Sequence, residues 1–303
     1  MQVHFGTGLL HPEWKQAVVC VGTFDGVHLG HQAVLSAAVR RAKELECPSV
    51  LVTFDRHPAH VLAPDRVPPA VASLDENLNQ MNQVGINAAV ILEFNRHLSE
   101  TSAQQFFDEV LVQKIRATEA VVGYDFAFGK GREGTAAWLS ERIPTTVVPA
   151  FEIDEHRASS TEVRQLISDG KMEAAARLLG RSWSISGVVV SGEKLGRTLG
   201  FPTINIARSS ETVTPPHGIY AGKCETPFGT YKAAINIGTR PTFDGAHRTI
   251  EAFLLDYPGE PLYSADVRLS IYSKLREEMK FDSPETLIQQ MVLDVEETNL
   301  RVK

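Results

Sequence analysis

Two histidines three residues apart stand where a short apolar run gives way to a helical pattern. They are His28 and His31, within the glycine-rich residues 22–31. Glycines let the backbone come close to a ligand, and a helix N-terminus offers unpaired N–H groups to phosphate. Both imidazoles can therefore face one phosphate chain and stabilise charge on an α-phosphate during in-line attack. The residues assigned to this phosphate site are Gly22, Phe24, Asp25, Gly26, His28, Gly30 and His31.

The same histidines allow a different chemistry, metal binding. Together with His57 and His60 they supply four side chains of a type that binds zinc. Their spacings match none of the usual zinc patterns, and no cysteine joins them. The phosphate interpretation is favoured, and the zinc site is kept as an alternative.

A second loop that could do phosphate chemistry lies at residues 196–205. It combines glycines, a proline and two short polar side chains. Such a loop can wrap phosphates with backbone donors while the Thr203 hydroxyl and the Asn205 amide oxygen coordinate Mg²⁺. The same composition is typical of any turn, so the loop alone is a weak indication.

The elements that must position the first loop alternate between two periodicities. Residues 17–21 form an apolar run typical of a buried strand, and residues 33–45 place apolar side chains on one helical stripe. Strands separated by helices predict βαβ units and a parallel sheet, whose ligands bind outside the carboxyl ends of the strands. The other segments expected in this half are strands at 49–54, 88–94, 120–123 and 145–148, and helices at 103–115 and 136–142.

The second half has a different pattern. Residues 159–180 favour two short helices separated by Gly170, with a capping-box spacing at the first. From residue 183 onward, strand-like runs divided by Gly/Pro-rich turns indicate an antiparallel barrel or sandwich, and Ser283 begins a last helix. The strand-like runs are 185–190, 219–224, 233–237, 250–255 and 267–272. We place the domain boundary between 182 and 183, which gives domains 1–182 and 183–303.

Composition excludes some function classes. The chain of 303 residues has a net charge of −7, and residues 183–303 carry 13 Lys and Arg against 15 Asp and Glu. Nucleic-acid binders present a basic surface, so this balance argues against them. The three cysteines, Cys20, Cys47 and Cys224, form neither a metal-ligand spacing nor a disulfide framework. With no signal-peptide pattern and no long apolar run, we expect a cytoplasmic protein.

Several further motifs accompany the histidine loop. They occupy residues 22–32, 52–58, 122–129 and 159–164. In order and spacing they resemble the FMN adenylyltransferase module of bacterial FAD synthetases, within the nucleotidyltransferase superfamily. The resemblance covers nearly the whole first domain and implies a Rossmann-like α/β fold with a parallel sheet.

The resemblance implies roles for three groups of residues. His28 and His31 would hold the ATP phosphates and act in catalysis. The group that would close over the triphosphate is Ser159, Ser160, Thr161 and Arg164. The flavin and nucleotide pocket would be formed by Phe54, His57, Pro58, Asp125, Phe126 and Phe128. Three hydroxyls at a helix start with a nearby arginine form an anion site on physical grounds too, although simple capping explains the hydroxyls alone.

One position departs from the family pattern. Ala158 stands where a branched apolar residue is more common, and we interpret this as a packing change. Lys130 and Arg132 could supply local counter-charges to phosphate, or be solvated loop residues.

The second half resembles the riboflavin kinase family. The motifs are residues 202–205, 218–221, 236–243 and 250–257. The resemblance implies a six-stranded antiparallel barrel with a carboxyl-terminal helix, in which Thr203 and Asn205 bind Mg-ATP. The residues it assigns to ATP and flavin are Gly196, Gly200, Pro202, Thr203, Asn205, Asn236, Arg240 and Thr242.

Glu251 would be the catalytic base of this second site. A carboxylate suits the task because phosphoryl transfer needs mainly positioning, charge neutralisation by metal and a proton acceptor. By simple strand alternation Glu251 could equally lie on a solvated face. Phe253 replaces a histidine common at that position in the family, which puts the adjoining pocket wall in doubt.

Together these features predict a bifunctional enzyme of FAD biosynthesis. The expected reactions are ATP-dependent phosphorylation of riboflavin to FMN, and adenylylation of FMN to FAD with release of pyrophosphate. ATP is the co-substrate and Mg²⁺ the cofactor; we expect no nucleic-acid or membrane partner, and a monomer or weak homo-oligomer. Two alternatives stay open: only one module is active and the other is regulatory, or the barrel binds nucleic acid.

Overall fold

The computed structural model describes the chain except for residues 9–12, 154–155, 193–198, 209–211 and 243–244. Contacts divide it into two compact units, Met1–Ser160 and Thr161–Lys303. Within the described residues, no helix is both long and apolar enough to cross a membrane.

The first unit is built on a six-stranded parallel sheet with the order β1-β4-β3-β2-β5-β8. Its central strands β2 and β4 are buried at every position, as expected for strands covered on both faces. The strands are β1 (Gln2–Phe5), β2 (Ala17–Val21), β3 (Ser49–Phe54), β4 (Ala88–Leu92), β5 (Ala117–Gly123) and β8 (Thr145–Val148). The remaining short strands of this unit are β6 (Ala127–Phe128), β7 (Gly134–Thr135), β9 (Glu152–Ile153) and β10 (His156–Arg157).

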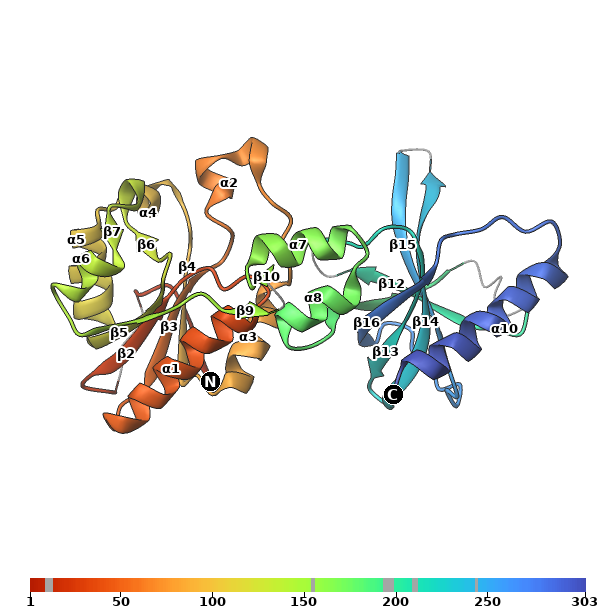
Figure 1. The fold of residues 1–303 in the computed structure, drawn as a ribbon, viewed down its shortest axis with the longest axis horizontal. Helices are drawn as coiled ribbons and strands as arrows, with labels where there is room; N and C mark the ends of the chain where they lie inside the picture. Colours follow the sequence, from red (N-terminus) through yellow and green to blue (C-terminus); the bar gives the residue numbers. More distant parts are fainter. Residues whose placement is uncertain (9–12, 154–155, 193–198, 209–211, 243–244) are drawn as a thin grey trace. The chain divides into compact units, whose positions relative to one another are not determined.

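Helices cover both faces of this sheet (Figure 1). Val18 and Leu51 face one core with side chains of α1 and α3, whereas Val19 and Val50 face the other, with η2 and α6. The elements are α1 (Leu29–Glu44), α2 (Ala59–Leu62), η1 (Pro64–Arg66), α3 (Leu74–Val84), α4 (Arg96–Glu100), α5 (Ala103–Gln105), η2 (Phe106–Lys114), η3 (Lys130–Arg132) and α6 (Ala136–Ser140). The α/β fold predicted for this half is thereby confirmed.

One helix differs from its prediction. The sequence pattern favours an ordinary helix over residues 103–115, but only α5 is α-helical, and η2 continues it as a π-helix. A π-helix is rare because its hydrogen bonds span one residue more than those of an α-helix. Periodicity over a short window does not separate the two.

The strand order places a ligand site at one point of the sheet edge. Strand β2 has β3 on one side and β5 on the other, so the direction in which successive strands are added to the sheet reverses at β2. Open α/β sheets bind ligands outside the carboxyl ends of the strands at such a switch point. Gly22 directly follows β2 and Gly123 ends β5, so the histidine loop and the Tyr124–Asp125 turn lie at this edge.

The second unit contains a closed barrel with the order β11-β12-β15-β14-β13-β16, antiparallel throughout. The strands are β11 (Trp183–Val190), β12 (Thr203–Arg208), β13 (Gly218–Thr226), β14 (Gly229–Thr242), β15 (Gly245–Leu254) and β16 (Asp266–Arg276). The helices are α7 (Ser160–Ser168), which begins at the last residue of the first unit, α8 (Met172–Leu179) and α10 (Pro284–Arg301). The barrel, rather than the sandwich, and the terminal helix are as the resemblance implied.

Side chains along the barrel strands alternate between interior and exterior. On β15, Ile250, Ala252 and Leu254 are buried, while Glu251 and Phe253 are half-buried. Period-two alternation therefore fills the interior with aliphatic side chains and turns Glu251 outward. The compact units divide after Ser160, and the functional boundary between 182 and 183 stays a prediction.

Candidate functional sites

The histidine loop of the first unit has an unusual backbone. Phe24, Gly26 and Val27 have φ values of 49°, 78° and 40°, all in the left-handed region. Glycine adopts this region freely, but a β-branched residue there costs on the order of 1–2 kcal/mol. Val27 is fully buried, so packing around it holds the strained conformation in place.

Buried polar side chains from outside the loop tie it down. Asn77 of α3 accepts a hydrogen bond from Gly26 N–H through its Oδ1 at 2.9 Å. Within the loop's own helix, Gln32 Nε2 donates to Val27 O at 2.9 Å. Asn77 is 7% exposed, so its amide cannot be replaced by water without rearrangement. Sequence analysis missed Asn77 because it did not predict α3.

Asp25 braces the loop with its carboxylate. The Val71 N–H donates to both carboxylate oxygens, at 2.9 and 3.0 Å, and the Ala72 N–H donates to one at 3.3 Å. The backbone carbonyl of Asp25 accepts from Ser160 Oγ at 2.8 Å. The sequence assigns Asp25 to phosphate binding, but these contacts point its carboxylate at neighbouring backbone, which suits a positioning role.

His28 and His31 stand together at the start of α1. His28 is the N-cap, and its Nδ1 accepts from His31 N–H at 3.3 Å. The two rings stack with centroids 3.6 Å apart, and the edge of Phe24 meets His31 at 5.1 Å. A Cβ on Gly30 would lie 3.1 Å from the His28 ring and 3.3 Å from Ala158 O, so a side chain there would crowd the pair.

The imidazole of His31 is held uncharged. Burial lowers the pKa of His31 well below its usual range, and the neighbouring His28 lowers it further. Its Nδ1 is buried and has no hydrogen-bond partner among the residues that the structure describes. If this nitrogen bears the ring proton, it can donate to an anion that binds at the neighbouring helix N–H groups.

The turn after β5 lies beside α1, the helix that follows the histidine loop. A Cβ on Gly123 would lie 3.4 Å from Asp125 Oδ1 and 4.0 Å from Val34 Cγ2 of α1. Asp125 is exposed, and its carbonyl accepts from Arg132 at 3.2 Å. The structure therefore brings Asp125 and the histidine loop to the same sheet edge.

The predicted aromatic pocket residues fall into two classes. Phe128 is buried in the core, stacked on Phe126 at 5.4 Å and edge-on to Trp138 at 5.5 Å. Phe54 is half-buried and meets Phe94 edge-on at 5.2 Å. Phe128 is thus a core residue, whereas Phe54 keeps exposed surface that a ligand could contact.

The other residues assigned to this site lie on short connecting segments. His57 Nδ1 accepts from Ala59 N–H at 3.1 Å, next to Pro58 at the start of α2. Ser159 and Ser160 end the first unit, and Thr161 and Arg164 follow on α7. Across the described part of the chain, no group of three or more His, Cys, Asp or Glu is placed to hold a metal ion, which leaves the zinc alternative without structural support.

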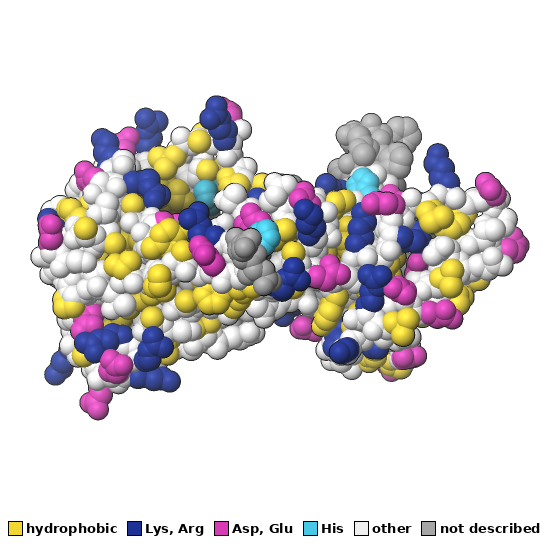
Figure 2. All heavy atoms as spheres, viewed as in Figure 1, with side chains coloured by type: hydrophobic (Ala, Val, Ile, Leu, Met, Phe, Trp, Pro, Cys, Tyr) yellow, Lys and Arg dark blue, Asp and Glu magenta, His cyan; other side chains and the backbone are white. Residues whose placement is uncertain are grey.

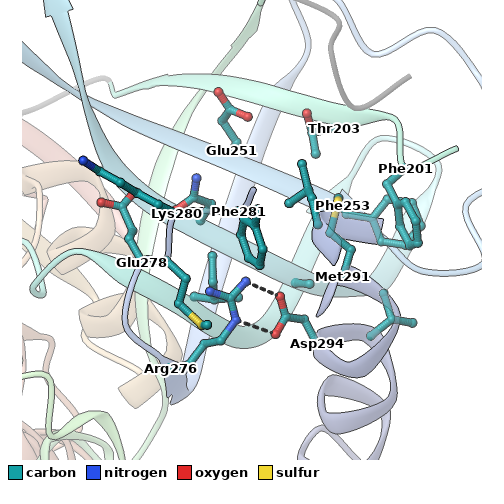
Figure 3. A pocket seen from close by; sticks show the side chains of 16 residues that line it. Phe201, Thr203, Glu251, Phe253, Arg276, Glu278, Lys280, Phe281, Met291 and Asp294 are labelled. Atoms are coloured by element: carbon teal, nitrogen blue, oxygen red, sulfur yellow. Dashed lines mark hydrogen bonds and ion pairs between the residues drawn. The ribbon is translucent and has the colours of Figure 1, made fainter. Parts of the chain in front are cut away.

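The second site is an open cavity of about 530 Å³ between the outer face of the barrel and α10 (Figure 3). The outward side chains of β12, β13, β14, β15 and β16 form one wall, and α10 with the segment before it forms the other. The lining residues are Phe201, Thr203, Ile219, Ala234, Asn236, Glu251, Phe253, Arg276, Glu278, Met279, Lys280, Phe281, Leu287, Met291, Asp294 and Val295.

Strand register places the polar groups of this cavity together. Glu251 pairs with Asn205 on one neighbouring strand and with Asn236 on the other. Asn236 Oδ1 is buried and has no hydrogen-bond partner within the described chain. Thr203 lies two residues before Asn205 on the same outward face of β12, opposite Phe253. The amide of Asn205 lies against Gly192, where a Cβ would clash with its Nδ2.

The rest of the lining is aromatic and aliphatic. Phe201 meets Phe253 edge-on at 5.2 Å, so the phenylalanine that departs from the family pattern is part of an aromatic wall. Leu287, Met291 and Val295 project from α10 at a spacing of four residues, which sets them on one stripe. Sequence analysis predicted this helix from Ser283 onward but did not connect it with a site.

An ion pair lines the side of the cavity opposite Glu251 (Figure 3). Arg276 Nε and Nη2 donate to the two carboxylate oxygens of Asp294, at 2.8 and 2.7 Å. The guanidinium also lies 5.8 Å from the centre of the Phe281 ring. Neither member of the pair was assigned to the site from the sequence, because an Arg and an Asp 18 positions apart show no local signature.

The remaining kinase residues are only partly described. Gly200 has a φ of 86°, which favours glycine at this turn, and Pro202 follows it on the surface. Arg240 and Thr242 lie on β14, and their side chains are outside the described part, as is Gly196 altogether. On the face drawn in Figure 2, Lys and Arg alternate with Asp and Glu, so the coloured residues form no continuous basic stripe there.

Comparisons with known proteins agree with this division. Residues 10–162 match the family described as FAD synthetase, and residues 179–301 match riboflavin kinase. A relative from Bacillus subtilis (strain 168) is 34% identical over 297 residues, covering 95% of this chain and 93% of its own. One from Escherichia coli (strain K12) is 35% identical over 286 residues, covering 91% and 90%. Both are described as bifunctional riboflavin kinase/FMN adenylyltransferase.

The fold also has a counterpart among solved structures. A crystal structure described as a macrolide-efflux protein from Streptococcus pneumoniae matches with a TM-score of 0.91 and 29% sequence identity, covering 99% of both chains. That description names a different activity from those of the two relatives. It adds support for the fold, while the family matches bear on the chemistry.

Proposed function

This chain belongs to the family of bifunctional riboflavin kinase/FMN adenylyltransferases, and on that premise we propose which of its residues perform each reaction. It phosphorylates riboflavin to FMN and adenylylates FMN to FAD. The match to both family models favours two active modules over the alternative of a single active one.

The cavity of the second unit is the riboflavin site. The observation that carries this assignment is the division of its lining into polar groups, among them Glu251, Thr203 and Asn236, and aromatic and aliphatic side chains, among them Phe253, Leu287 and Met291. Riboflavin has the same division, a flat tricyclic ring and a polar ribityl chain. The ring lies among Phe253, Leu287 and Met291, and the chain directs its 5′-hydroxyl toward Glu251.

Glu251 accepts the proton of that hydroxyl. The 5′-oxygen attacks the γ-phosphorus of ATP, the bond from this phosphorus to the β–γ bridging oxygen breaks, and ADP leaves. The buried Asn236 Oδ1 beside Glu251 is placed to accept a hydrogen bond from the ribityl chain, which would satisfy an otherwise unpaired atom.

Thr203 and Asn205 fit the Mg²⁺ that this reaction requires. Their neutral oxygens share one face of β12, and Mg²⁺ in kinases is bound mainly by phosphates and water with few protein ligands. When bound, the ion neutralises phosphate charge. In this chain, Thr203 and Asn205 fix where the triphosphate lies relative to Glu251.

The first unit joins FMN to AMP at the histidine loop. A phosphate oxygen of FMN attacks the α-phosphorus of ATP, the α–β bond breaks and pyrophosphate leaves. The attacking oxygen is already ionised near neutral pH, so no general base is needed. His28, His31 and the N–H groups at the start of α1 stabilise the negative charge on the phosphates. Asp125, Ser159 and Ser160 complete the site as the family motifs imply.

One incubation tests the whole assignment. The purified chain with riboflavin, ATP and Mg²⁺ should yield FMN and then FAD, resolved by chromatography. Formation of neither product by the folded chain would overturn the proposed function. The cytoplasmic location and the monomeric or weakly oligomeric state inferred from the sequence stay predictions.

A further inference from the structure

The side chains that helix α10 buries are polar, and one of them is paired with a residue of the barrel. Its buried side chains, among those described, are Asp294 and Thr298. Thr298 Oγ donates to Asp294 O at 2.7 Å, and the Asp294 carboxylate receives both nitrogens of Arg276. Asp294 is 8% exposed by its side chain and Arg276 17%. A charge buried to this degree is tolerated only with its partner in place.

Arg276 is held in one orientation by three contacts. Besides the two bonds to Asp294, its Nη1 donates to Glu277 O at 3.0 Å. A bidentate pair fixes the plane of the guanidinium as well as its position. Gln290 Nε2 also donates to Asp294 Oδ1, at 3.1 Å, so the carboxylate is itself oriented. Both members of the pair line the cavity, on the side away from Glu251 (Figure 3).

The far end of the helix is anchored separately. Lys232 Nζ donates to Asn299 O at 3.0 Å, Arg301 donates to Lys274 O at 3.2 Å, and Val302 is fully buried. These contacts do not involve the cavity. Loss of the Arg276–Asp294 pair would therefore release the first turns of α10, which bear Leu287 and Met291, while the last turn stays in place.

We propose that Asp294 is a positioning residue for the riboflavin kinase reaction. Through Arg276 it fixes the first turns of α10, against which the flavin ring rests. It thereby sets the distance between the 5′-hydroxyl of the bound riboflavin and Glu251. This rests on the proposed function, since it needs the flavin ring in this cavity. Because Asp294 acts on the flavin side, its loss weakens riboflavin binding and leaves ATP binding nearly unchanged.

The test uses Asp294→Asn, which keeps the shape and removes the charge, in the full chain. The Michaelis constant for riboflavin should rise by about tenfold or more, and that for ATP by less than about twofold. Glu296→Gln removes a charge from an exposed position of the same helix and should change neither constant. FAD formation from supplied FMN reports on the first unit and should be unchanged. An unchanged riboflavin constant, or an equal rise for both substrates, overturns the proposal.

Two further variants keep the test decisive. If Asp294→Asn does not fold, Arg276→Lys takes its place under the same criterion, because it keeps both charges and loses the bidentate geometry. The double variant Arg276→Gln with Asp294→Asn should be no worse than the more damaging single variant if the two act as a unit, whereas additive defects contradict the proposal.

Failure of this inference and failure of the proposed function can be told apart by riboflavin binding without ATP. Leu287→Arg places a charge in the cavity and should abolish quenching of riboflavin fluorescence by the protein. If Leu287→Arg binds riboflavin normally, the cavity is not the flavin site and the proposed function fails there. If it abolishes binding while Asp294→Asn does not weaken it, only the positioning role of Asp294 fails.

Discussion

The two sites of this molecule are held in shape by opposite means. The histidine loop bends through left-handed conformations at Phe24 and Val27 and is tied by buried polar groups of Asp25 and Asn77. Glu251 lies on a regular antiparallel strand, whose extended backbone is free of strain for nearly every type of residue. The first site therefore depends on local strain and its braces, and the second on strand register and a covering helix. The strained loop needs particular residues at consecutive positions to adopt its backbone conformation, whereas a site on a regular strand needs no such contiguous motif.

The largest effect that sharpens this comparison is expected at Glu251. Glu251→Gln removes the proton acceptor without changing its shape, and FMN formation should fall about 10²–10⁴-fold. FAD formation from supplied FMN should be unaffected because it belongs to the other unit. Chromatography of both products measures the effect, and Glu260→Gln at an exposed position is the control. Loss of both reactions in folded Glu251→Gln would show that the sites are not independent.

The reverse separation is expected for His31. His31→Ala removes a buried nitrogen beside the helix N-terminus, and FAD formation should fall about 10²–10³-fold, as when one charge-stabilising group is lost. FMN formation should stay within about twofold of its normal rate, since loss of uncoupled groups leaves other sites intact. His97→Ala, at an exposed position of the same unit, should leave both rates unchanged. Normal FAD formation by His31→Ala would remove His31 from the site.

The braces of the strained loop can be tested at Asn77. Asn77→Ala leaves the buried Gly26 N–H without its acceptor, so the free energy of unfolding should drop by about 1–3 kcal/mol. FAD formation should fall about tenfold, because the loop loses its fixed geometry, with FMN formation unchanged. Asn77→Leu fills a similar volume without an acceptor oxygen and should lose as much of both as Asn77→Ala. A clearly smaller loss in Asn77→Leu than in Asn77→Ala would point to packing rather than to the hydrogen bond.

The smallest effect is a pH dependence of stability. The unfolded chain protonates a histidine near pH 6.5, but the pKa of His31 lies well below that value in the folded protein because of burial and His28. As pH falls below about 6.5, the unfolded state binds a proton at His31 that the folded state does not bind, so the free energy of unfolding decreases. Relative to His31→Gln, the wild-type chain should lose up to about 1 kcal/mol between about pH 7.5 and pH 5.5. Parallel denaturation curves at both pH values would contradict this.

Much of the fold followed from periodicity, and so did the histidine loop. Apolar runs alternating with helical stripes indicated the parallel sheet, and closely spaced strands without helices indicated the barrel. His28 and His31 were recognisable because they follow a glycine-rich loop between a strand and a helix, where Gly26 has the left-handed φ that favours glycine. Their braces were not, because Asn77 lies about 50 residues away on a helix that the pattern did not reveal.

The cavity of the second unit was the harder part to foresee. Strand alternation left open that Glu251 faces outward, and it did not show that α10 covers that face. Leu287, Met291 and Asp294 became site residues only through the tertiary position of the helix. Phe128 shows the converse, because a residue within a family motif packs in the core instead of opening onto a ligand.

The kinase cavity lies outside a closed barrel whose interior is filled by its own aliphatic side chains. The side chains at interior positions such as Ile235 and Leu269 are buried and do not line the cavity. On the proposed function, substitutions at Ile235 and Leu269 change the stability of the barrel, whereas substitutions of Leu287 or Met291, which line the cavity, change which ring systems are accepted. Thermal stability and substrate preference thus depend largely on different residues, and selection can change one of them with little effect on the other.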